Sequence, residues 1–455
     1  MRASAASELR RLLGERAFVR GSLSRYASDA TEHEGLRRSP DLVVVPGSTE
    51  EVRLVVEWAY RREVPLVPRG GGTGFSGGAV PVNGGVVVDL SRLNGVRSLD
   101  PGFWRMHVEA GTTTATVRRL ARENGLYFPP DPGAAEQSQI GGNIATNAGG
   151  PHAFKYGVTG DWVMGLEAVI PPGEVISVGG AIRKDVAGYD LKSLLVGSEG
   201  TLGIITAAWL RLLPSPESAL PLVAAYPGTA EGCAAIEAVL ASGVVPAAIE
   251  FLEGAALAAG REAFPINLPA SRFLVICECD GSADEAARTR AELREALVPG
   301  CLQLWAPNRR QEFEALWRWR DGVSLAVASQ RGGKVSEDIV VPVDRLREAI
   351  ESTVRIGEDY GLEACSWGHA GDGNLHSTFL VDANRRSEVE RAHAAARDLH
   401  ALAVALGGSI SGEHGIGWLK RGRLGVQWGD RALQLHQQIK RVFDPKNLIN
   451  PGKKT

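Results

Sequence analysis

Ten residues, 69–78, carry six glycines and read RGGGTGFSGG. Glycine has no Cβ, so a segment of this density can turn several backbone N–H groups toward one point without side-chain clashes. Such a group of donors favours an anion, and a phosphate is the expected ligand. The segment therefore predicts a phosphate-binding loop, with a flexible glycine turn that has no ligand as the alternative.

Two common phosphate-binding motifs are excluded by the residues on the C-terminal side of this loop. Gly72, Gly74 and Gly77 have the spacing of the dinucleotide-binding fingerprint, but the next residues, AVPVNGG, cannot open the helix whose N-terminus that mechanism needs. No Lys-Ser or Lys-Thr pair comes after the glycines either, which excludes a P-loop. We therefore reject a nicotinamide-binding Rossmann domain and a P-loop.

Two further glycine-rich segments lie later in the chain. Residues 129–133 (PPDPG) lead into residues 140–150 (IGGNIATNAGG), and residues 197–206 read GSEGTLGIIT. Three such loops predict an extended ligand, because small residues let the backbone approach a long molecule closely. We expect hydrogen bonds to this ligand from five side chains: Thr73, Ser76, Asn143, Asn147 and Thr206.

The length of 455 residues exceeds what one hydrophobic core supports, so at least two domains are expected. Residues 42–45 (LVVV) indicate a buried strand, and Ser48 with Glu51 forms a capping box that begins a helix. The cluster Leu213-Pro214-Ser215-Pro216 is typical of a boundary, and helical and strand-like patterns alternate beyond it. The predicted domains are 1–215 and 216–430, with 431–455 returning to the first.

Composition narrows the class of function. A hydrophobic content of 44% and a formal net charge of −3 suit a globular protein that handles a small molecule, and they give no reason to expect nucleic acid. The five cysteines are expected to be reduced thiols. No signal peptide and no apolar run of about 18 residues is found, so we expect a cytoplasmic protein and leave peripheral membrane association open.

The three glycine-rich segments, taken in order and with Lys155-Tyr156-Gly157, resemble the FAD domain of the vanillyl-alcohol oxidase and para-cresol methylhydroxylase superfamily over about residues 40–215. Some members tether FAD to a histidine in the first loop, and this loop has none, which implies non-covalent FAD. His152 is interpreted as local structure rather than an attachment site. The resemblance implies cofactor binding by Pro68, Arg69, Gly70, Gly71, Gly72, Thr73, Gly74, Ser76, Gly77, Gly78, Pro132, Gly141, Gly142, Asn143, Asn147, Gly149, Gly150, Gly160, Glu199, Gly200, Gly203, Ile205 and Asn450.

Three of the nine histidines fall in two short motifs, GHAGDGNLH at 368–376 and SGEHGIG at 411–417. Two imidazoles and a carboxylate are a typical ligand set for a catalytic divalent metal, and His369, His376 and Glu413 fill it. Zinc or manganese is the expected ion. His414 is then the candidate general base. The alternative is that these are polar loop residues whose hydrogen bonds are made to the backbone.

Both motifs, with residues 334–342 (KVSEDIVVP), resemble the FAD-linked oxidase C-terminal domain of D-lactate, glycolate and D-2-hydroxyglutarate dehydrogenases. The resemblance implies that Arg320 and Lys334 hold the substrate carboxylate, with Ser324 one helical turn beyond Arg320. Arg318 is a weaker competitor. Thr378 stands where some 2-hydroxyglutarate enzymes carry asparagine, which argues against preference for a dicarboxylate. Asp372 is either a support for the metal-binding histidines or a loop cap.

The combined prediction is an α+β flavoprotein with a two-subdomain FAD domain of the para-cresol methylhydroxylase type and an α+β cap with a ferredoxin-like sheet. It oxidises a small D-2-hydroxy acid by hydride transfer to flavin N5. The alternatives are a non-catalytic flavoprotein subunit of a glycolate oxidase-type complex and a metal-dependent hydrolase. The sequence does not choose among a quinone, a soluble carrier and an iron–sulfur subunit as the electron acceptor. It also leaves two assemblies open, a homodimer and a hetero-complex.

Overall fold

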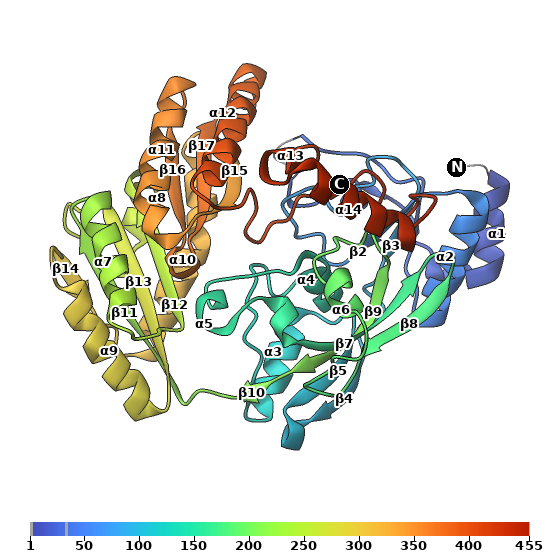
Figure 1. The fold of residues 1–455 in the computed structure, drawn as a ribbon, viewed down its shortest axis with the longest axis horizontal. Coiled ribbons are helices and arrows are strands. Elements are labelled where there is room, and N and C mark those ends of the chain that lie inside the picture. The colour runs from blue at the N-terminus through green and yellow to red at the C-terminus, as the bar shows by residue number, and fades with distance from the viewer. Residues whose placement is uncertain (1–2, 32–34, 455) are drawn as a thin grey trace. The chain divides into compact units, whose positions relative to one another are not determined.

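The structure is a computed structural model that describes residues 3–31 and 35–454. It divides into two compact units, whose elements are labelled in Figure 1. Unit 1 comprises Met1–Gly149, Val158–Ser215 and Glu413–Thr455, and unit 2 comprises Gly150–Gly157 and Pro216–Gly412. Each unit is therefore built from segments that are far apart in the sequence.

Unit 1 begins with helix α1 (Ala3–Leu13) and a parallel sheet of the order β1-β3-β2. The strands are β1 (Leu42–Val44), β2 (Leu66–Arg69) and β3 (Val86–Asp89). Ser48 Oγ accepts a hydrogen bond from Glu51 N at 3.1 Å and begins helix α2 (Thr49–Arg62), whose apolar face is buried. The predicted strand and the predicted helix start are both confirmed.

The second sheet of unit 1 is antiparallel, with the order β4-β5-β9-β7-β8. Its strands are β4 (Val96–Asp100), β5 (Arg105–Glu109), β7 (Val163–Ile170), β8 (Glu174–Gly179) and β9 (Ile204–Arg211). Helices α3 (Thr114–Glu123), α4 (Ile140–Thr146) and α6 (Leu191–Leu195) interrupt them, and β6 (Leu126–Tyr127) pairs with β10 (Leu213–Pro214). The first glycine-rich segment follows β2 and the third leads into β9, but most of the second is helix α4, where a loop was expected.

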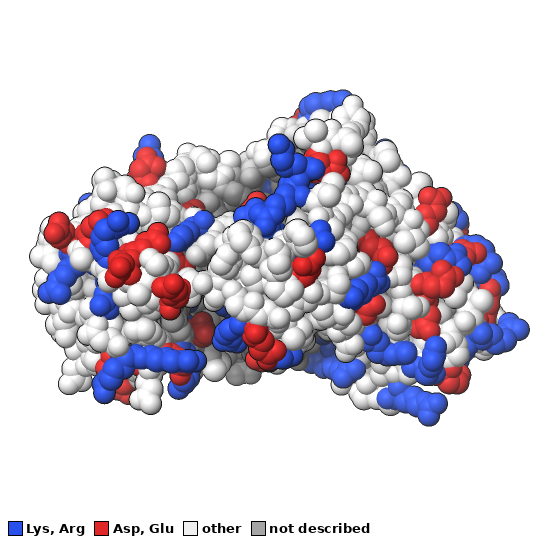
Figure 2. Space-filling model, turned by 90° about the horizontal axis from the view of Figure 1, so that it is seen from below, with Lys and Arg blue, Asp and Glu red and all other residues white. Residues whose placement is uncertain are grey.

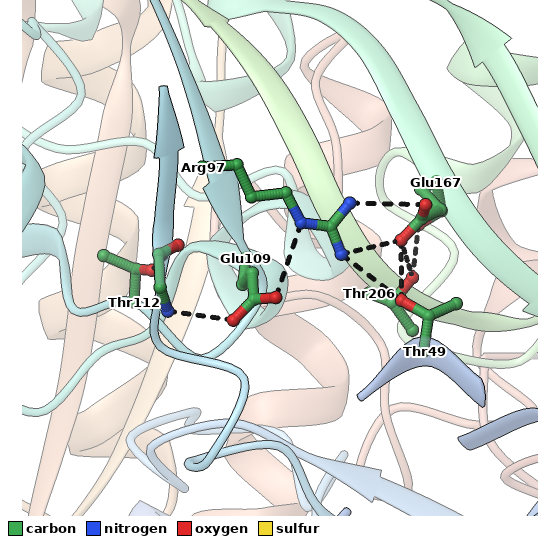
Figure 3. Close-up of polar contacts among 7 residues, drawn as sticks. Thr49, Arg97, Glu109, Thr112, Glu167 and Thr206 are labelled. Carbon is green, nitrogen blue, oxygen red and sulfur yellow. Dashed lines mark hydrogen bonds and ion pairs between the residues drawn. The ribbon is translucent and has the colours of Figure 1, made fainter. Parts of the chain in front are cut away.

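A polar network joins this sheet to helix α2 (Figure 3). The Arg97 guanidinium lies between Glu109 and Glu167, with its NH2 group 3.1 Å from Glu167 Oε1. Thr49 Oγ1 and Thr206 Oγ1 donate to the same carboxylate oxygen at 2.7 Å and 2.9 Å. Thr206, which was expected to reach a ligand, thus directs its hydroxyl to Glu167.

Unit 2 is built on one seven-stranded sheet with the order β14-β11-β13-β12-β16-β17-β15, in which neighbouring strands are antiparallel. The strands are β11 (Ser218–Tyr226), β12 (Ala248–Glu253), β13 (Phe273–Gly281), β14 (Gln303–Trp305), β15 (Gly333–Val340), β16 (Ala364–His369) and β17 (Asn374–Val381). Successive side chains of each strand point to opposite faces, so the sheet has two distinct surfaces.

Helices cover both surfaces of this sheet (Figure 1). One apolar cluster contains residues of α7 (Thr229–Ala241), α9 (Ala283–Leu297), α11 (Leu346–Asp359) and α12 (Arg386–Ala405). A second cluster contains residues of α8 (Gly254–Gly260) and α10 (Arg310–Ser329) with alternate strand residues such as Leu252 and Trp367. Helix α5 (Ala153–Tyr156) also belongs to unit 2, where Tyr156 donates to Asp280 of β13.

The segment from Glu413 onward belongs to unit 1 and contains α13 (Leu424–Gln427) and α14 (Asp430–Phe443). Beyond α14 the chain runs along strand β2, where Leu66 N donates to Leu448 O and Asn450 N donates to Leu66 O. The buried Lys440 ammonium donates to Thr201 O at 2.7 Å. The segment is thus fixed to the sheet that carries the first glycine-rich loop.

Basic and acidic side chains are interspersed on the face that Figure 2 displays, in keeping with the formal net charge of −3. Within residues 3–31 and 35–454, no helix combines the length and the apolar character needed to cross a membrane.

Candidate active site

The first glycine-rich loop leaves the end of β2 and needs glycine for steric reasons. A Cβ at Gly71 would lie 2.1 Å from Gln137 O, and Gly72 and Gly77 have φ values of +71° and +75°. A Cβ at Gly70 would lie 3.6 Å from the Cα atom of Gly142. The first two predicted ligand-binding segments are therefore side by side in unit 1.

The third segment joins them. Glu199 N donates to Ala145 O at 2.6 Å, and a Cβ at Gly200 would lie 3.2 Å from Pro68 Cγ. Asn450 Nδ2 donates to Gly78 O at 3.0 Å and to Glu199 O at 2.9 Å. Three distant segments and the C-terminal segment thus converge in one place.

Buried polar atoms beside these loops fit a polar cofactor. Gln139 Oε1, Ser198 Oγ and Asn450 Oδ1 are buried and have no hydrogen-bond partner among the described residues. Buried polar groups are nearly always satisfied. The two amide oxygens fit a ligand that carries O–H or N–H donors, and the Ser198 hydroxyl can donate or accept; FAD has such donors on its sugar-like chain and its rings. Sequence reasoning missed Gln139, which immediately precedes the second glycine-rich segment, and Ser198, which lies within the third.

Several side chains predicted to bind the cofactor hydrogen-bond the protein instead. The Arg69 guanidinium donates to Ser28 O at 2.8 Å. Asn147 Oδ1 accepts from Gly160 N at 2.8 Å. The Glu199 carboxylate accepts from the N–H groups of Ile416 and Gly417 at 2.9 Å and 2.6 Å. These contacts shape the loops, and direct cofactor binding by these residues stays a prediction.

The other predicted cofactor residues follow the path of these loops. Pro68 lies in β2 and Ile205 in β9, whereas Gly160 lies in a 3₁₀ turn between α5 and β7. Asn143 lies in α4 and donates through Nδ2 to Thr114 Oγ1 at 2.7 Å. The remaining members are Thr73, Gly74, Ser76 and Gly78 in the first loop, Pro132, Gly141 and Gly142 before and within α4, Gly149 and Gly150 after it, and Gly203 before β9.

In unit 2, strand register places the predicted substrate residues on the surface that faces α8 and α10. Ser336 is opposite Thr378, and Asp338 is opposite His376, across the β15–β17 pair. The hydroxyls of Ser336 and Thr378 lie 2.7 Å apart. Lys334, two residues before Ser336 and so on the same surface, donates to Ser324 Oγ of α10 at 2.5 Å. We call this set the polar face: Lys334, Ser336, Asp338, Trp367, His369, His376 and Thr378.

The histidines of the polar face are close to each other. The His369 and His376 rings are edge to face, with centroids 5.4 Å apart. The ligand atoms of His376 and Asp338 lie within 4.8 Å of each other. His369 does not belong to this group of neighbouring ligand atoms. Asp338, which the sequence did not single out, is therefore a further candidate for metal binding.

A buried carboxylate connects the polar face to helix α10. Glu250 of β12 is fully buried, and its Oε1 atom lies 2.5 Å from His369 Nδ1. Its Oε2 atom forms an ion pair with the Arg320 guanidinium. Arg320 is buried and Arg318 is exposed, so α10 directs Arg320 toward the sheet. Glu250 was also missed, although a single carboxylate within the apolar run AIEFL is a signal.

The SGEHGIG motif is divided between the two units. In unit 2, Asp338 Oδ2 accepts from Ser411 Oγ and from Gly412 N, both at 2.9 Å. In unit 1, a Cβ at Gly149 would lie 3.0 Å from Glu413 Oε2, and the His414 ring centroid is 4.8 Å from that of Phe75. The ligand atoms of Glu413 and His414 lie within 4.8 Å of each other. The predicted base thus contacts the first glycine-rich loop.

The sequence left two interpretations open for each of His152 and Asp372, and both side chains make contacts within unit 2. His152 Nε2 lies 2.8 Å from Glu278 Oε1 within unit 2. Asp372 is exposed, and its Oδ1 atom accepts from Asn374 N at 3.4 Å, as expected for a loop cap.

The comparisons with known proteins agree with these features. The FAD binding domain model matches residues 40–179, and the model for the C-terminal domain of FAD linked oxidases matches residues 215–454. Glycolate oxidase subunit GlcD of Bacillus subtilis is 35% identical over 430 residues, covering 94% of this chain and 91% of that protein. D-lactate dehydrogenase of Archaeoglobus fulgidus is 37% identical over 419 residues, covering 90% of each.

The solved structures show the same architecture. A crystal structure of p-cresol methylhydroxylase with substrate bound has a TM-score of 0.82 at 19% identity, covering 99% of this chain and 96% of that chain. This likeness confirms the predicted fold class, and the family matches confirm the resemblance found in the glycine-rich and histidine motifs. The chain belongs to the FAD-linked oxidase family and is an FAD-dependent oxidoreductase.

Proposed function

We propose that this enzyme is a dehydrogenase that oxidises a small D-2-hydroxy acid, such as D-lactate or glycolate, to the 2-oxo acid. The observation that carries the proposal is the polar face of unit 2, where one surface collects Lys334 and two imidazoles and where α10 adds the Arg320 guanidinium. The names of the two relatives, a glycolate oxidase subunit and a D-lactate dehydrogenase, support this substrate class.

Arg320 and Lys334 hold the substrate carboxylate through charge-assisted hydrogen bonds. Lys334 Nζ is already oriented, since it donates to Ser324 Oγ and lies 5.0 Å from the centre of the Trp367 ring. Thr378 is fully buried and its hydroxyl pairs with Ser336, so it borders the site with a small polar group. This arrangement suits a small substrate with one carboxylate.

His369, His376 and Glu413 would hold a divalent metal, zinc or manganese, which when bound supplies a Lewis acid for the substrate hydroxyl. The donors fit such an ion because imidazoles and carboxylates are its usual protein ligands. Asp338 supports the set in two ways: its ligand atom is close to that of His376, and it binds the backbone immediately before Glu413.

His414 accepts the hydroxyl proton. Its contact with Phe75 keeps the imidazole beside the loop that we assign to FAD. FAD, held by the glycine-rich segments of unit 1, would supply the hydride acceptor, flavin N5. We propose non-covalent FAD, because residues 69–78 contain no histidine to form a link.

Electrons then leave for a quinone, a soluble carrier or an iron–sulfur subunit. The relative from Bacillus subtilis is named as a subunit, which favours a hetero-complex and keeps a non-catalytic relay subunit as the second candidate. We propose a cytoplasmic location, where thiols stay reduced, because all five cysteines are free.

The test is anaerobic mixing of the purified protein with D-lactate, glycolate and D-2-hydroxyglutarate, following flavin absorbance with and without a chelator. We expect one acid to reduce the flavin and the chelator to slow the reduction. His414→Ala should lower the reduction rate about 10²- to 10⁴-fold, as loss of a general base does. His436→Ala, at an exposed position of α14, is the matched control and should leave the rate unchanged.

A bound flavin that none of these acids reduces would refute the dehydrogenase and favour the relay subunit. Reduction that proceeds equally in His414→Ala would refute the assignment of the base.

A further inference from the structure

Glu250 contacts two side chains that the proposed function assigns to different tasks. It lies in β12 between Ile249 and Phe251, all three with no exposed surface. One carboxylate oxygen is 2.5 Å from His369 Nδ1, and the other pairs with the Arg320 guanidinium. The partners come from positions 70 and 119 residues away in the sequence.

The contact with His369 determines how that ring is presented. A carboxylate beside Nδ1 requires the Nδ1–H tautomer, because a deprotonated Nδ1 would place two lone pairs against each other. The lone pair of the neutral imidazole is then on Nε2, the ring nitrogen with the chemistry to ligate a metal. A carboxylate behind a ligating histidine also raises its basicity.

The contact with Arg320 determines how the guanidinium is presented. Its NH2 group forms the ion pair with Glu250, whereas its Nε atom is buried and has no acceptor among the described residues. A buried donor without an acceptor is costly, so a ligand oxygen is the natural partner. The carboxylate of a substrate has the required chemistry.

We propose that Glu250 is a positioning residue that orients the metal ligand His369 and the carboxylate-binding Arg320 at the same time. The proposal rests on the proposed function and deepens it, because it makes metal affinity and substrate affinity depend on one buried carboxylate. A merely structural role would instead lower stability and leave both affinities unchanged in the folded protein.

The experiment compares Glu250→Gln with the matched control Glu253→Gln in the full-length, FAD-loaded protein. Glu253 is three residues further along the same strand and accepts from Ser366 N at 3.3 Å, away from His369 and Arg320. Zinc affinity is measured by competition with a chromophoric chelator, and KM and kcat with the acid that reduces the wild-type flavin fastest.

We expect Glu250→Gln to weaken zinc binding about 10- to 100-fold, as loss of a supporting carboxylate does. KM should rise in the same variant. Glu250→Asp keeps the charge and should restore part of both. Arg320→Lys should raise KM and leave zinc affinity within about twofold, because His369 keeps its partner. Glu253→Gln should resemble the wild type in both readouts.

Flavin content and melting temperature show that each variant is folded, and the double variant Glu250→Gln/Arg320→Gln removes both buried charges if the single one does not fold. The proposal is overturned if a folded Glu250→Gln protein, single or double, binds zinc as tightly as the wild type. Failure of the proposed function is detected by a different measurement: none of the tested acids would reduce the flavin of the wild-type protein. Zinc affinity is measured without turnover, so it tests the role of Glu250 in that case as well.

Discussion

The glycine-rich loops of unit 1 and the polar face of unit 2 present their binding groups in different ways. In the loops, small residues and left-handed backbone bring main-chain groups together, and polar side chains such as Arg69 and Asn147 stabilise the backbone. On the polar face, the backbone is a regular sheet, and the side chains carry the chemistry. A site made of backbone should be damaged by adding atoms, and a site made of side chains by changing charges.

The largest effect is expected from a change of charge on the polar face. In Asp338→Asn, one carboxylate oxygen becomes an NH2 group that faces the donors Asn374 Nδ2, Ser411 Oγ or Gly412 N. Loss of about two hydrogen bonds to a charged acceptor should lower the free energy of unfolding by about 4 kcal/mol.

Urea unfolding measures this change. Asp372→Asn, at an exposed position, is the control and should alter stability by less than about 0.5 kcal/mol. Equal stability of the two variants would show that the polar face does not depend on the charge of Asp338.

The next effect tests the backbone site. In Gly71→Ala the added methyl group would lie 2.1 Å from Gln137 O, so the loop must move. We expect a loss of about 3 kcal/mol, in the range of overpacked sites, and a low ratio of flavin to protein absorbance. Gly180→Ala, outside the three glycine-rich segments, has nothing within 4 Å of the added atom and should keep its flavin. If both variants keep their flavin, the steric account of the first loop is wrong.

The smallest effect concerns Glu253, a half-buried carboxyl at the end of β12 and outside the polar face. Burial is the main cause that raises the pKa of Glu253 from 4.5 to about 6. The folded state therefore holds this proton more tightly, so stability is highest below pH 4.5 and falls as the pH rises from 4.5 through 6. At about 1.4 kcal/mol per pKa unit, the loss approaches about 2 kcal/mol.

Glu253→Gln cannot ionise, so it should be more stable than the wild type by up to about 2 kcal/mol at pH 8, with no gain at pH 4.5. Thermal unfolding at the two pH values measures the difference. A gain that does not change with pH would point to packing rather than ionisation.

Local sequence patterns predicted the parts of the molecule that are made locally. The helix that begins after Ser48, the strand at Leu42 and the first glycine-rich loop all depend on neighbouring residues, and the structure has them in place. The second glycine-rich segment was expected to be a loop and is mostly helix α4. The motifs also identified the family, since the residues of each motif are contiguous.

Glu250 and Asp338 were missed because their importance arises from strand pairing. Glu250 meets His369 across the β12–β16 pair, 119 residues apart, and no local pattern encodes that register. For the same reason the sequence could identify Arg69 and Glu199 as members of the loops but could not show which atoms their side chains bind.

The Ser336–Thr378 hydroxyl pair has a consequence for how such enzymes diversify. Both residues stand directly opposite each other in neighbouring strands, beside Lys334 and the histidines, and each contributes only a few atoms beyond Cβ. Exchanging either one for a smaller or larger residue changes the space beside Lys334 and the histidines by the volume of one or two atoms. The strand backbone and its hydrogen bonds stay the same. Under the proposed function, a change of preferred acid would therefore require no new fold and no new cofactor loop, only one or two substitutions in a sheet that is already formed.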